Sequence, residues 1–370
     1  MNLNSILLTD SPINRVSGGG IVSLNLLEVL QEVSDVKLIL SGQHFENSKY
    51  GEIPSYCIKP EQFDYSDPFF SDYFAKALIE ETNEPLDLAI SYGCPWGNTF
   101  EKLKKDYFCK LIADLAPHNI SISRAEHLKW TNSYNYPHLI NEFLWGVYSK
   151  HLRLADIVVT HSKQSSEYIK NVAKLEREPT VIPHGTYIPD KITPYPKQFS
   201  PAYMSSLGFD KGIVYLIKAI INLKTKLIIG GQEATNFNRF LEAFGLQKEK
   251  NLFKVTGHIP DLADFYKQVS VLIAPSVTEG FGICGLEAMA YGKPVIVSTG
   301  TGVAELIEDG KEGFVIGIRD PKAIYDKIQY FIDNPSEVQR MGKEARKTAE
   351  KYTWDKIRKQ YITIYKELLE

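Results

Sequence analysis

The sequence predicts an α/β protein built from two doubly wound parallel-sheet domains. Short apolar runs without polar alternation recur along the chain, and longer stretches that favour helices separate them. Such runs are typical of strands buried on both faces, and the helices between them supply the crossovers that parallel strands require. A chain of 370 residues is long enough for two domains of this kind.

The predicted strands fall into two sets, separated by a proline-rich joint. Residues 183–196 contain four prolines and one glycine, a composition that excludes a helix or a central strand. We therefore place a boundary near Asp190, between domains at 1–190 and 191–345. The predicted strands are 6–8, 36–40, 88–90, 110–113, 157–159 and 181–182 in the first set, and 202–204, 226–229, 252–255, 270–274, 295–297 and 314–316 in the second.

The composition excludes several classes of protein. Hydrophobic residues make up 44% and charged residues 24% of the chain, as in ordinary globular proteins, and the net charge of −3 gives no general reason to bind nucleic acid. The four cysteines lie far apart and predict reduced thiols in a cytoplasmic protein. No apolar stretch approaches the roughly 20 residues of a membrane span, and the N-terminus lacks the basic start of a signal peptide. Peripheral membrane contact stays open.

The most informative segment for function runs from Glu279 to Glu287. It follows the predicted strand 270–274 through a glycine-rich turn, and it leads into a helix-forming stretch and then into the predicted strand 295–297. This order aims backbone N–H groups and a helix N-terminus at the edge of a parallel sheet where anions bind. Both carboxylates could therefore address one ligand. Solvated surface acids are one alternative, and the acid–base pair of a hydrolase is another, disfavoured because the helix would hold Glu287 far from Glu279.

A glycine-rich segment near the N-terminus, Ser17–Ile21, follows the first predicted strand and precedes the helical run Val22–Leu30. Glycines allow positive φ and close approach to a phosphate or sugar, although a flexible surface turn explains the segment equally well. It does not match G-x-G-x-x-G followed by an acidic residue at the next strand. A dehydrogenase therefore loses its main support.

Lys211 lies at the start of a predicted helix, Gly212–Ile220. A cation at this end of a helix opposes the helix dipole, so an anionic ligand such as a diphosphate accounts for it. A solvated lysine is the alternative.

Together these segments resemble a retaining glycosyltransferase of the GT-B architecture, in the large family called family 4 or group 1. The resemblance implies two Rossmann-like domains facing each other across a cleft, the first binding the acceptor and the second the nucleotide sugar. It also implies that residues 346–370 form a helix crossing back to the first domain. The segments that carry it are Glu279–Glu287, Lys211–Gly212, Ile182–Gly185, Ala155–Asp156 and Tyr352–Trp354.

The resemblance also implies roles for individual residues. Glu279 would bind hydroxyls of the transferred sugar, Glu287 the ribose, and Lys211 the leaving diphosphate. His118 and Asp114 follow a predicted strand where the family offers a histidine or aspartate to the sugar, with loop capping as the alternative. The remaining donor contacts fall on Gly19, Gly20, Ser206, Ile259, Phe281, Gly282, Ile283 and Cys284.

One position departs from the family pattern. Five residues before the lysine, where the family usually has an arginine, this chain has Ser206, which cannot grip a diphosphate with two hydrogen bonds. Either another cation such as Arg15 substitutes, or the chain is a slow or non-catalytic relative.

The implied activity is therefore retaining, hexosyltransferase-like transfer from a nucleoside diphosphate sugar to a hydroxyl of a glycan, lipid or small molecule. It needs no metal or other cofactor. A nucleotide-sugar 2-epimerase and a non-catalytic nucleotide-sugar binder are the alternatives. The aromatic-rich segment 129–148 could stack on an acceptor sugar or touch a membrane, or simply pack as a core helix.

Overall fold

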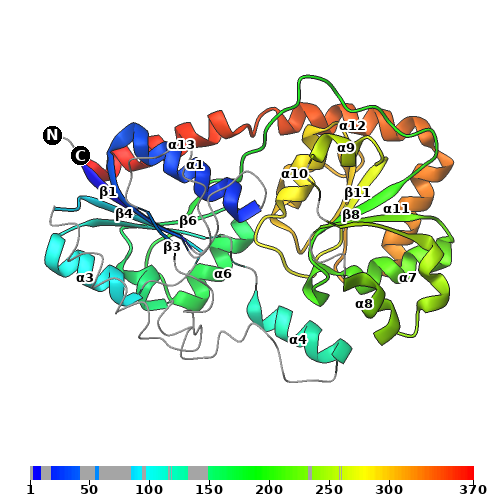
Figure 1. The fold of residues 1–370 in the computed structure, drawn as a ribbon, viewed down its shortest axis with the longest axis horizontal. Helices are drawn as coiled ribbons and strands as arrows, with labels where there is room; N and C mark the ends of the chain where they lie inside the picture. The colour runs from blue at the N-terminus through cyan, green and yellow to red at the C-terminus, as the bar shows by residue number, and fades with distance from the viewer. Residues whose placement is uncertain are drawn as a thin grey trace. The chain divides into compact units, whose positions relative to one another are not determined.

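The chain separates into two compact units (Figure 1). Unit 1 comprises Met1–Pro117, His138–His184 and Trp354–Glu370, and unit 2 comprises His118–Pro137 and Gly185–Thr353. The sequence-based limits, at residues 190 and 345, differ from these by several residues and did not separate residues 118–137 from the N-terminal half. The computed structural model describes residues 3–9, 18–41, 55–57, 85–93, 97–115, 117, 119–131, 149–231, 236–257, 259 and 261–370.

Unit 1 contains a seven-stranded parallel sheet of order β3-β2-β1-β4-β5-β6-β7. The chain adds strands on one side of β1 up to β3 and then continues on its other side from β4, as in doubly wound folds. Strand β3 was not predicted, because its three residues at the sheet edge form no apolar run. The strands are β1 (Asn4–Thr9), β2 (Asp35–Ser41), β3 (Ser55–Cys57), β4 (Leu88–Tyr92), β5 (Lys110–Asp114), β6 (Ile157–Thr160) and β7 (Thr180–Val181), and the helices are α1 (Gly18–Val33), α3 (Gly97–Tyr107), α6 (Lys163–Ala173) and α13 (Trp354–Leu369).

Unit 2 contains a six-stranded parallel sheet of order β10-β9-β8-β11-β12-β13. Its strands are β8 (Pro201–Met204), β9 (Leu227–Gly230), β10 (Phe253–Gly257), β11 (Val271–Ala274), β12 (Val295–Ser298) and β13 (Gly313–Ile316). The α-helices are α4 (Ile120–Thr131), α7 (Ile213–Leu223), α8 (Phe237–Ala243), α9 (Leu262–Tyr266), α10 (Ile283–Ala290), α11 (Pro321–Asp333) and α12 (Pro335–Ala349); the 3₁₀ helices are η2 (Phe209–Lys211), η4 (Gln247–Leu252) and η5 (Gly302–Leu306). The predicted doubly wound α/β fold is confirmed.

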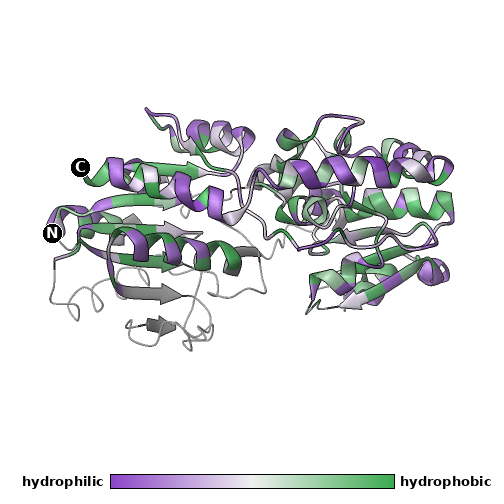
Figure 2. Cartoon of the chain, turned by 90° about the horizontal axis from the view of Figure 1, so that it is seen from above, coloured by the Kyte–Doolittle hydropathy of each residue, from purple (hydrophilic) through white to green (hydrophobic). Residues whose placement is uncertain are grey.

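Most strands of unit 2 are apolar and buried on both faces, and the edge strand β10, with its exposed Lys254, is the exception. Along β11, Val271 and Ile273 enter a core shared with α7 and α11, whereas Leu272 and Ala274 enter a second core shared with α10 and α12. Alternate residues of β11 thus face opposite layers, and all four are buried. Figure 2 shows apolar residues concentrated on the strands and on the inner sides of the helices.

The proline-rich joint is fastened to unit 2 by a buried lysine. The Nζ of Lys293, a residue with 0% exposure, donates to the carbonyls of Thr193 and Pro194 at 3.1 and 2.9 Å. Burial lowers the pKa of Lys293 to about 8. The hydroxyl of Tyr195 donates to the carbonyl of Gly292 at 2.5 Å. Residues 193–195 are therefore held by hydrogen bonds to Gly292 and Lys293, which lie just before β12.

The C-terminal helix α13 belongs to unit 1, where it packs against α1. Arg358 of α13 forms an ion pair with Glu28 of α1. The hydroxyl of Tyr361 donates to Asp114 Oδ2, at the end of β5, over 2.7 Å. Among the described residues, no helix is long and apolar enough to cross a membrane.

We expect Tyr361→Phe to lower the free energy of unfolding by about 1–3 kcal/mol, because a buried carboxylate oxygen loses its donor. Urea titration measures the change. Tyr365→Phe is the matched control, because its buried hydroxyl has no hydrogen-bond partner among the described residues. Equal losses in the two variants would contradict the role given to the Tyr361 hydroxyl.

Candidate functional site

The loop between β11 and α10, which we call the glutamate loop (residues 275–282), is fixed by backbone hydrogen bonds on two sides. The N–H of Val277 donates to the carbonyl of Asp210 at 2.7 Å, and the N–H of Glu279 donates to the carbonyl of Gly300 at 2.8 Å. The carbonyl of Phe281 accepts from Val303 N–H at 2.6 Å. The loop therefore holds Glu279 rigidly at the C-terminal edge of the sheet.

Lys211 and Glu279 form an ion pair at the centre of this site. The Nζ of Lys211 lies 2.5 Å from Glu279 Oε2 and 3.9 Å from Asp210 Oδ2, and all three side chains are at most 23% exposed. Burial disfavours the charged ammonium, but the two carboxylates outweigh it and raise the pKa of Lys211. The lysine therefore stays cationic, with two acids as its immediate electrostatic partners.

Two glycines allow the lysine and glutamate segments to approach. Gly212 has a φ of 72°, and a Cβ there would lie 2.0 Å from the carbonyl oxygen of Pro275. Gly282, with a φ of 87°, precedes the first residue of α10 and stands against Glu279, whose Cγ would lie 3.4 Å from an added Cβ. At Gly212 both the positive φ and the contact with Pro275 require glycine, whereas at Gly282 the positive φ alone favours it.

The first two turns of α10 carry Cys284 and Glu287. Burial raises the pKa of the Cys284 thiol to about 12, with the charges of Glu287 and Glu279 acting in the same direction. This thiol is therefore protonated and a poor nucleophile at neutral pH. Burial also raises the pKa of Glu287 to about 7. Glu287 consequently changes charge within the physiological pH range.

Other predicted donor residues also lie in unit 2. Ser206 lies between β8 and η2, and its carbonyl accepts from the Tyr203 hydroxyl at 2.5 Å. Ile259 follows β10 and packs on Gly230, where an added Cβ would lie 2.6 Å from Ile259 Cδ1. Phe281 is 2% exposed and belongs to the core, and Ile283 is the first residue of α10. Their predicted contacts with a donor stay predictions.

The predicted residues of unit 1 differ in their surroundings. Gly19 and Gly20 lie in the first turn of α1, within the helix, whereas the sequence placed them in a loop. Asp114 is 1% exposed, with one oxygen bonded to Tyr361 and the other 3.0 Å from His161 Nε2 without hydrogen-bond geometry. Its predicted contact with a sugar stays a prediction. His118 and Arg15 lie outside the described residues.

Sequence analysis missed the contribution of α4 to this site. The N–H of Asn119 donates to Thr278 Oγ1 at 2.8 Å, and the Ser123 hydroxyl donates to Asp210 Oδ2 at 3.2 Å. Both acceptors are next in sequence to a residue of the ion pair. No motif marks these contacts, because they join residues 159 and 87 positions apart.

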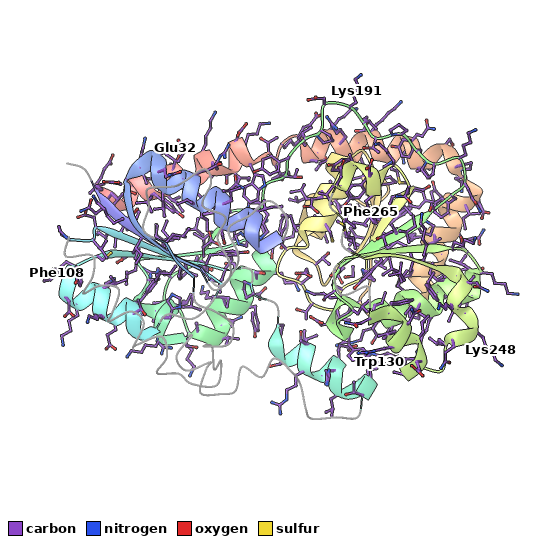
Figure 3. All side chains as sticks on the ribbon, in the orientation of Figure 1. Glu32, Phe108, Trp130, Lys191, Lys248 and Phe265 are labelled. Atoms are coloured by element: carbon purple, nitrogen blue, oxygen red, sulfur yellow. The ribbon has the colours of Figure 1, made fainter. Side chains whose placement is uncertain are left out.

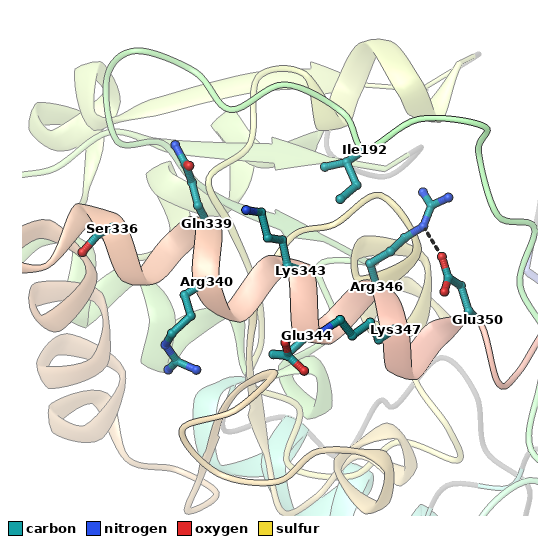
Figure 4. Close-up of a pocket in the computed structure, with 9 residues that line it drawn as sticks. All are labelled: Ile192, Ser336, Gln339, Arg340, Lys343, Glu344, Arg346, Lys347 and Glu350. Carbon is teal, nitrogen blue, oxygen red and sulfur yellow. Dashed lines mark hydrogen bonds and ion pairs between the residues drawn. The ribbon is translucent and has the colours of Figure 1, made fainter.

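A surface groove along α12 does not include the ion pair. It is lined by Ile192 and by polar side chains of α12, including Arg346 and Lys347 (Figure 4). These two cations already pair with Glu350 and Glu344, at 3.0 and 2.7 Å. In the part of the chain that the structure describes, no group of three or more histidine, cysteine or acidic residues could hold a metal ion.

Comparison with known sequences identifies the family of the C-terminal half. Residues 188–348 match the family model of glycosyl transferases group 1. An uncharacterized glycosyltransferase of Methanocaldococcus jannaschii is 32% identical over 176 residues, which are 45% of each chain. A capsular polysaccharide biosynthesis glycosyltransferase of Staphylococcus aureus is 30% identical over 180 residues, 46% of this chain and 47% of the relative. This chain thus spans about half the length of these curated relatives.

Solved structures extend the likeness of the fold to the whole chain. Sucrose-phosphate synthase of Thermosynechococcus elongatus has a TM-score of 0.79 at 18% identity, covering 100% of this chain and 99% of that one. The Anabaena protein HepE, solved with UDP-glucose, has a TM-score of 0.73 at 18% identity, covering 98% and 99%. At this identity the likeness concerns the fold. Residues 188–348 therefore belong to the group 1 glycosyltransferases, and the chain has the GT-B fold.

Proposed function

We propose that this protein transfers a sugar from a nucleoside diphosphate sugar to a hydroxyl acceptor, with retention at the anomeric carbon. The observation that carries the proposal is the Lys211–Glu279 ion pair, held by backbone contacts just before the N-terminus of α10. A cation beside helix N–H groups suits a diphosphate, and a carboxylate beside that cation suits the hydroxyls of the attached sugar. The acceptor is a sugar, a lipid or a small molecule.

The chemistry follows from the charges. Lys211 and the N–H groups at the start of α10 stabilise the negative charge that develops on the departing diphosphate. When a phosphate oxygen pairs with Lys211, Glu279 is released from the lysine to accept hydrogen bonds from the sugar. Glu287, farther along α10, accepts from the ribose hydroxyls. The leaving phosphate takes the proton of the acceptor hydroxyl on the same face of the sugar, so the proposal needs neither a protein nucleophile nor a metal.

A two-stage experiment tests this function. A thermal-shift screen with nucleoside diphosphate sugars first identifies the donor, since ligand at 100 times its dissociation constant adds about 2.7 kcal/mol of stability. NMR of the glycoside product, made in the presence of EDTA, then reads its anomeric configuration. An inverted product rejects retention, and turnover that requires a metal rejects the metal-free mechanism. Donor binding without turnover favours the non-catalytic binder, and free nucleoside diphosphate with a 2-epimerised sugar favours the epimerase.

We expect Lys211→Ala to lower turnover and nucleotide affinity by one to two powers of ten. The variant removes the cation from the diphosphate, and a charge-assisted hydrogen bond contributes about 1.5–3 kcal/mol. Calorimetry with the nucleoside diphosphate and initial rates measure the two effects. Lys226→Ala, which removes the same charge from an exposed site in unit 2, is the control.

Ser206→Arg should leave turnover and nucleotide affinity unchanged or improve them, and a loss in that variant would argue against a phosphate site beside Ser206.

Glu279 and Glu287 should have separable effects. Glu279→Gln should lower turnover and spare the affinity for free nucleoside diphosphate, because the carboxylate is assigned to the sugar alone. Glu287→Gln should weaken the nucleotide itself, because it is assigned to the ribose. Calorimetry with free nucleoside diphosphate distinguishes them. If both variants lose this affinity equally, the two assignments are wrong.

Donor affinity should rise with pH through the titration of Glu287. The pKa of this carboxyl is raised from 4.5 to about 7, so it is mostly protonated at pH 6 and mostly ionised at pH 8. Only the ionised form accepts from both ribose hydroxyls, and we expect roughly a tenfold gain in affinity between these pH values. A donor lacking the ribose hydroxyls, or the Glu287→Gln variant, should show a flat profile. A matching slope in either would assign the pH dependence to another group.

A further inference from the structure

Helix α4 and the residue before it contact the immediate neighbours of Lys211 and Glu279, namely Asp210 and Thr278. Asn119 precedes the helix, and its N–H donates to Thr278 Oγ1, beside Glu279. One turn later the hydroxyl of Ser123, itself 1% exposed, donates to Asp210 Oδ2, beside Lys211. Both contacts lie inside unit 2, although α4 comes from the N-terminal half of the sequence.

A buried acid clamps α4 in this position. Glu126 is 1% exposed and accepts from Arg319 at 2.5 Å, from the Tyr215 hydroxyl at 2.8 Å and from Trp130 Nε1 at 3.2 Å. Burial opposes its charge, but these hydrogen bonds together outweigh burial and lower the pKa of Glu126. Removing one partner from such a network leaves a charge without compensation. The helix is therefore fixed on α7 and on the loop after β13.

Aromatic contacts reinforce the clamp in the C-terminal half of α4. Trp130, labelled in Figure 3, lies on α4. Its ring packs edge-on against Tyr215 of α7 and Phe244 at the end of α8, with ring centroids 5.6 and 6.3 Å apart. His127 packs against Phe209, the first residue of the short helix that ends at Lys211, with centroids 5.7 Å apart. Ser123 is thus presented to Asp210 by a helix with several independent anchors.

The contact between Ser123 and Asp210 has an electrostatic consequence. The oxygen that accepts from Ser123 is the same Oδ2 that lies 3.9 Å from Lys211 Nζ, beyond hydrogen-bonding distance. The hydrogen bond from Ser123 uses one of the two lone pairs of this oxygen and ties the carboxylate to α4, at its present distance from the lysine. Without the hydroxyl, Asp210 could become a second acid in direct contact with Lys211, besides Glu279, and compete with a phosphate after Glu279 has turned to the sugar.

We propose that Ser123 is a positioning residue for sugar transfer, which holds the Asp210 carboxylate away from Lys211 so that the lysine can meet the donor diphosphate. The inference rests on the proposed function for the identity of the ligand. The restraint of Asp210 by Ser123 concerns the unliganded protein and can be tested without a ligand. Asn119 and Glu126 act with Ser123 by fixing α4 to the glutamate loop, to α7 and to the loop after β13.

A double-mutant cycle tests this role with the nucleoside diphosphate of the donor found in the screen. Ser123→Ala should weaken nucleoside diphosphate binding and kcat by roughly five- to twentyfold, because Asp210 then pairs with Lys211. Adding Asp210→Asn removes the competing charge, so the double variant should recover most of the affinity. Ser121→Ala, at an exposed serine of the same helix, should match the unchanged protein. A double variant as weak as Ser123→Ala, or weaker, would overturn the proposal.

Crystal structures of the unliganded protein and of Ser123→Ala give a second reading that needs no ligand. We expect the distance from Asp210 Oδ2 to Lys211 Nζ to contract from 3.9 Å to a direct contact of about 2.8 Å in the variant. An unchanged distance overturns the inference even if the protein is an active transferase. Absence of nucleotide binding in the unchanged protein overturns the proposed function instead, and the distance then still decides whether Ser123 restrains Asp210.

Discussion

The candidate site depends on one backbone oxygen, the carbonyl of Asp210. It accepts from the N–H groups of Val277 and Thr278, at 2.7 and 3.4 Å, and so joins two loops that are distant in sequence. Lys211 is the residue after Asp210, and Glu279 is the residue after Thr278. The backbone contacts therefore bring the two charged side chains together. Because the junction is made by the main chain and by a glycine pressed on Pro275, side-chain substitution elsewhere in the loops leaves it intact.

The fold could be predicted because burial on both faces of a parallel sheet leaves a direct trace in sequence. Each predicted strand overlaps an observed one, and the alternate residues of β11 show why no polar position interrupts it. The two errors have the same origin. A three-residue edge strand, β3, has no buried run to recognise, and Gly18–Gly20 were read as a loop although they form the first turn of α1. Three successive glycines have low helix propensity, so their composition does not indicate that α1 already begins at Gly18.

The site was predictable only where chemistry lies within one segment. The order of strand, glycine-rich turn and helix marked Glu279 and Lys211, and the structure places their charged atoms 2.5 Å apart. Contacts across the fold left no such mark. Asp114 has the position of a strand-end acid, and no motif indicates that Tyr361, 247 residues later, donates to one of its oxygens. In the same way, nothing around Ser123 or Glu126 announces a helix that docks on the second sheet domain.

Lys211 thus interacts with two acids at different distances, Glu279 in direct contact and Asp210 farther away. Burial lowers the pKa of a lysine, and the direct contact with Glu279 opposes this effect at Lys211 and keeps the ammonium charged before any ligand is present. A second acid in direct contact would strengthen the cation further and also compete for it. The 3.9 Å separation of Asp210, with its facing oxygen bonded to Ser123, avoids that competition while retaining the longer-range attraction. The departure at Ser206 makes this restraint more important, because the cation that the described residues offer to the proposed diphosphate at this position is Lys211.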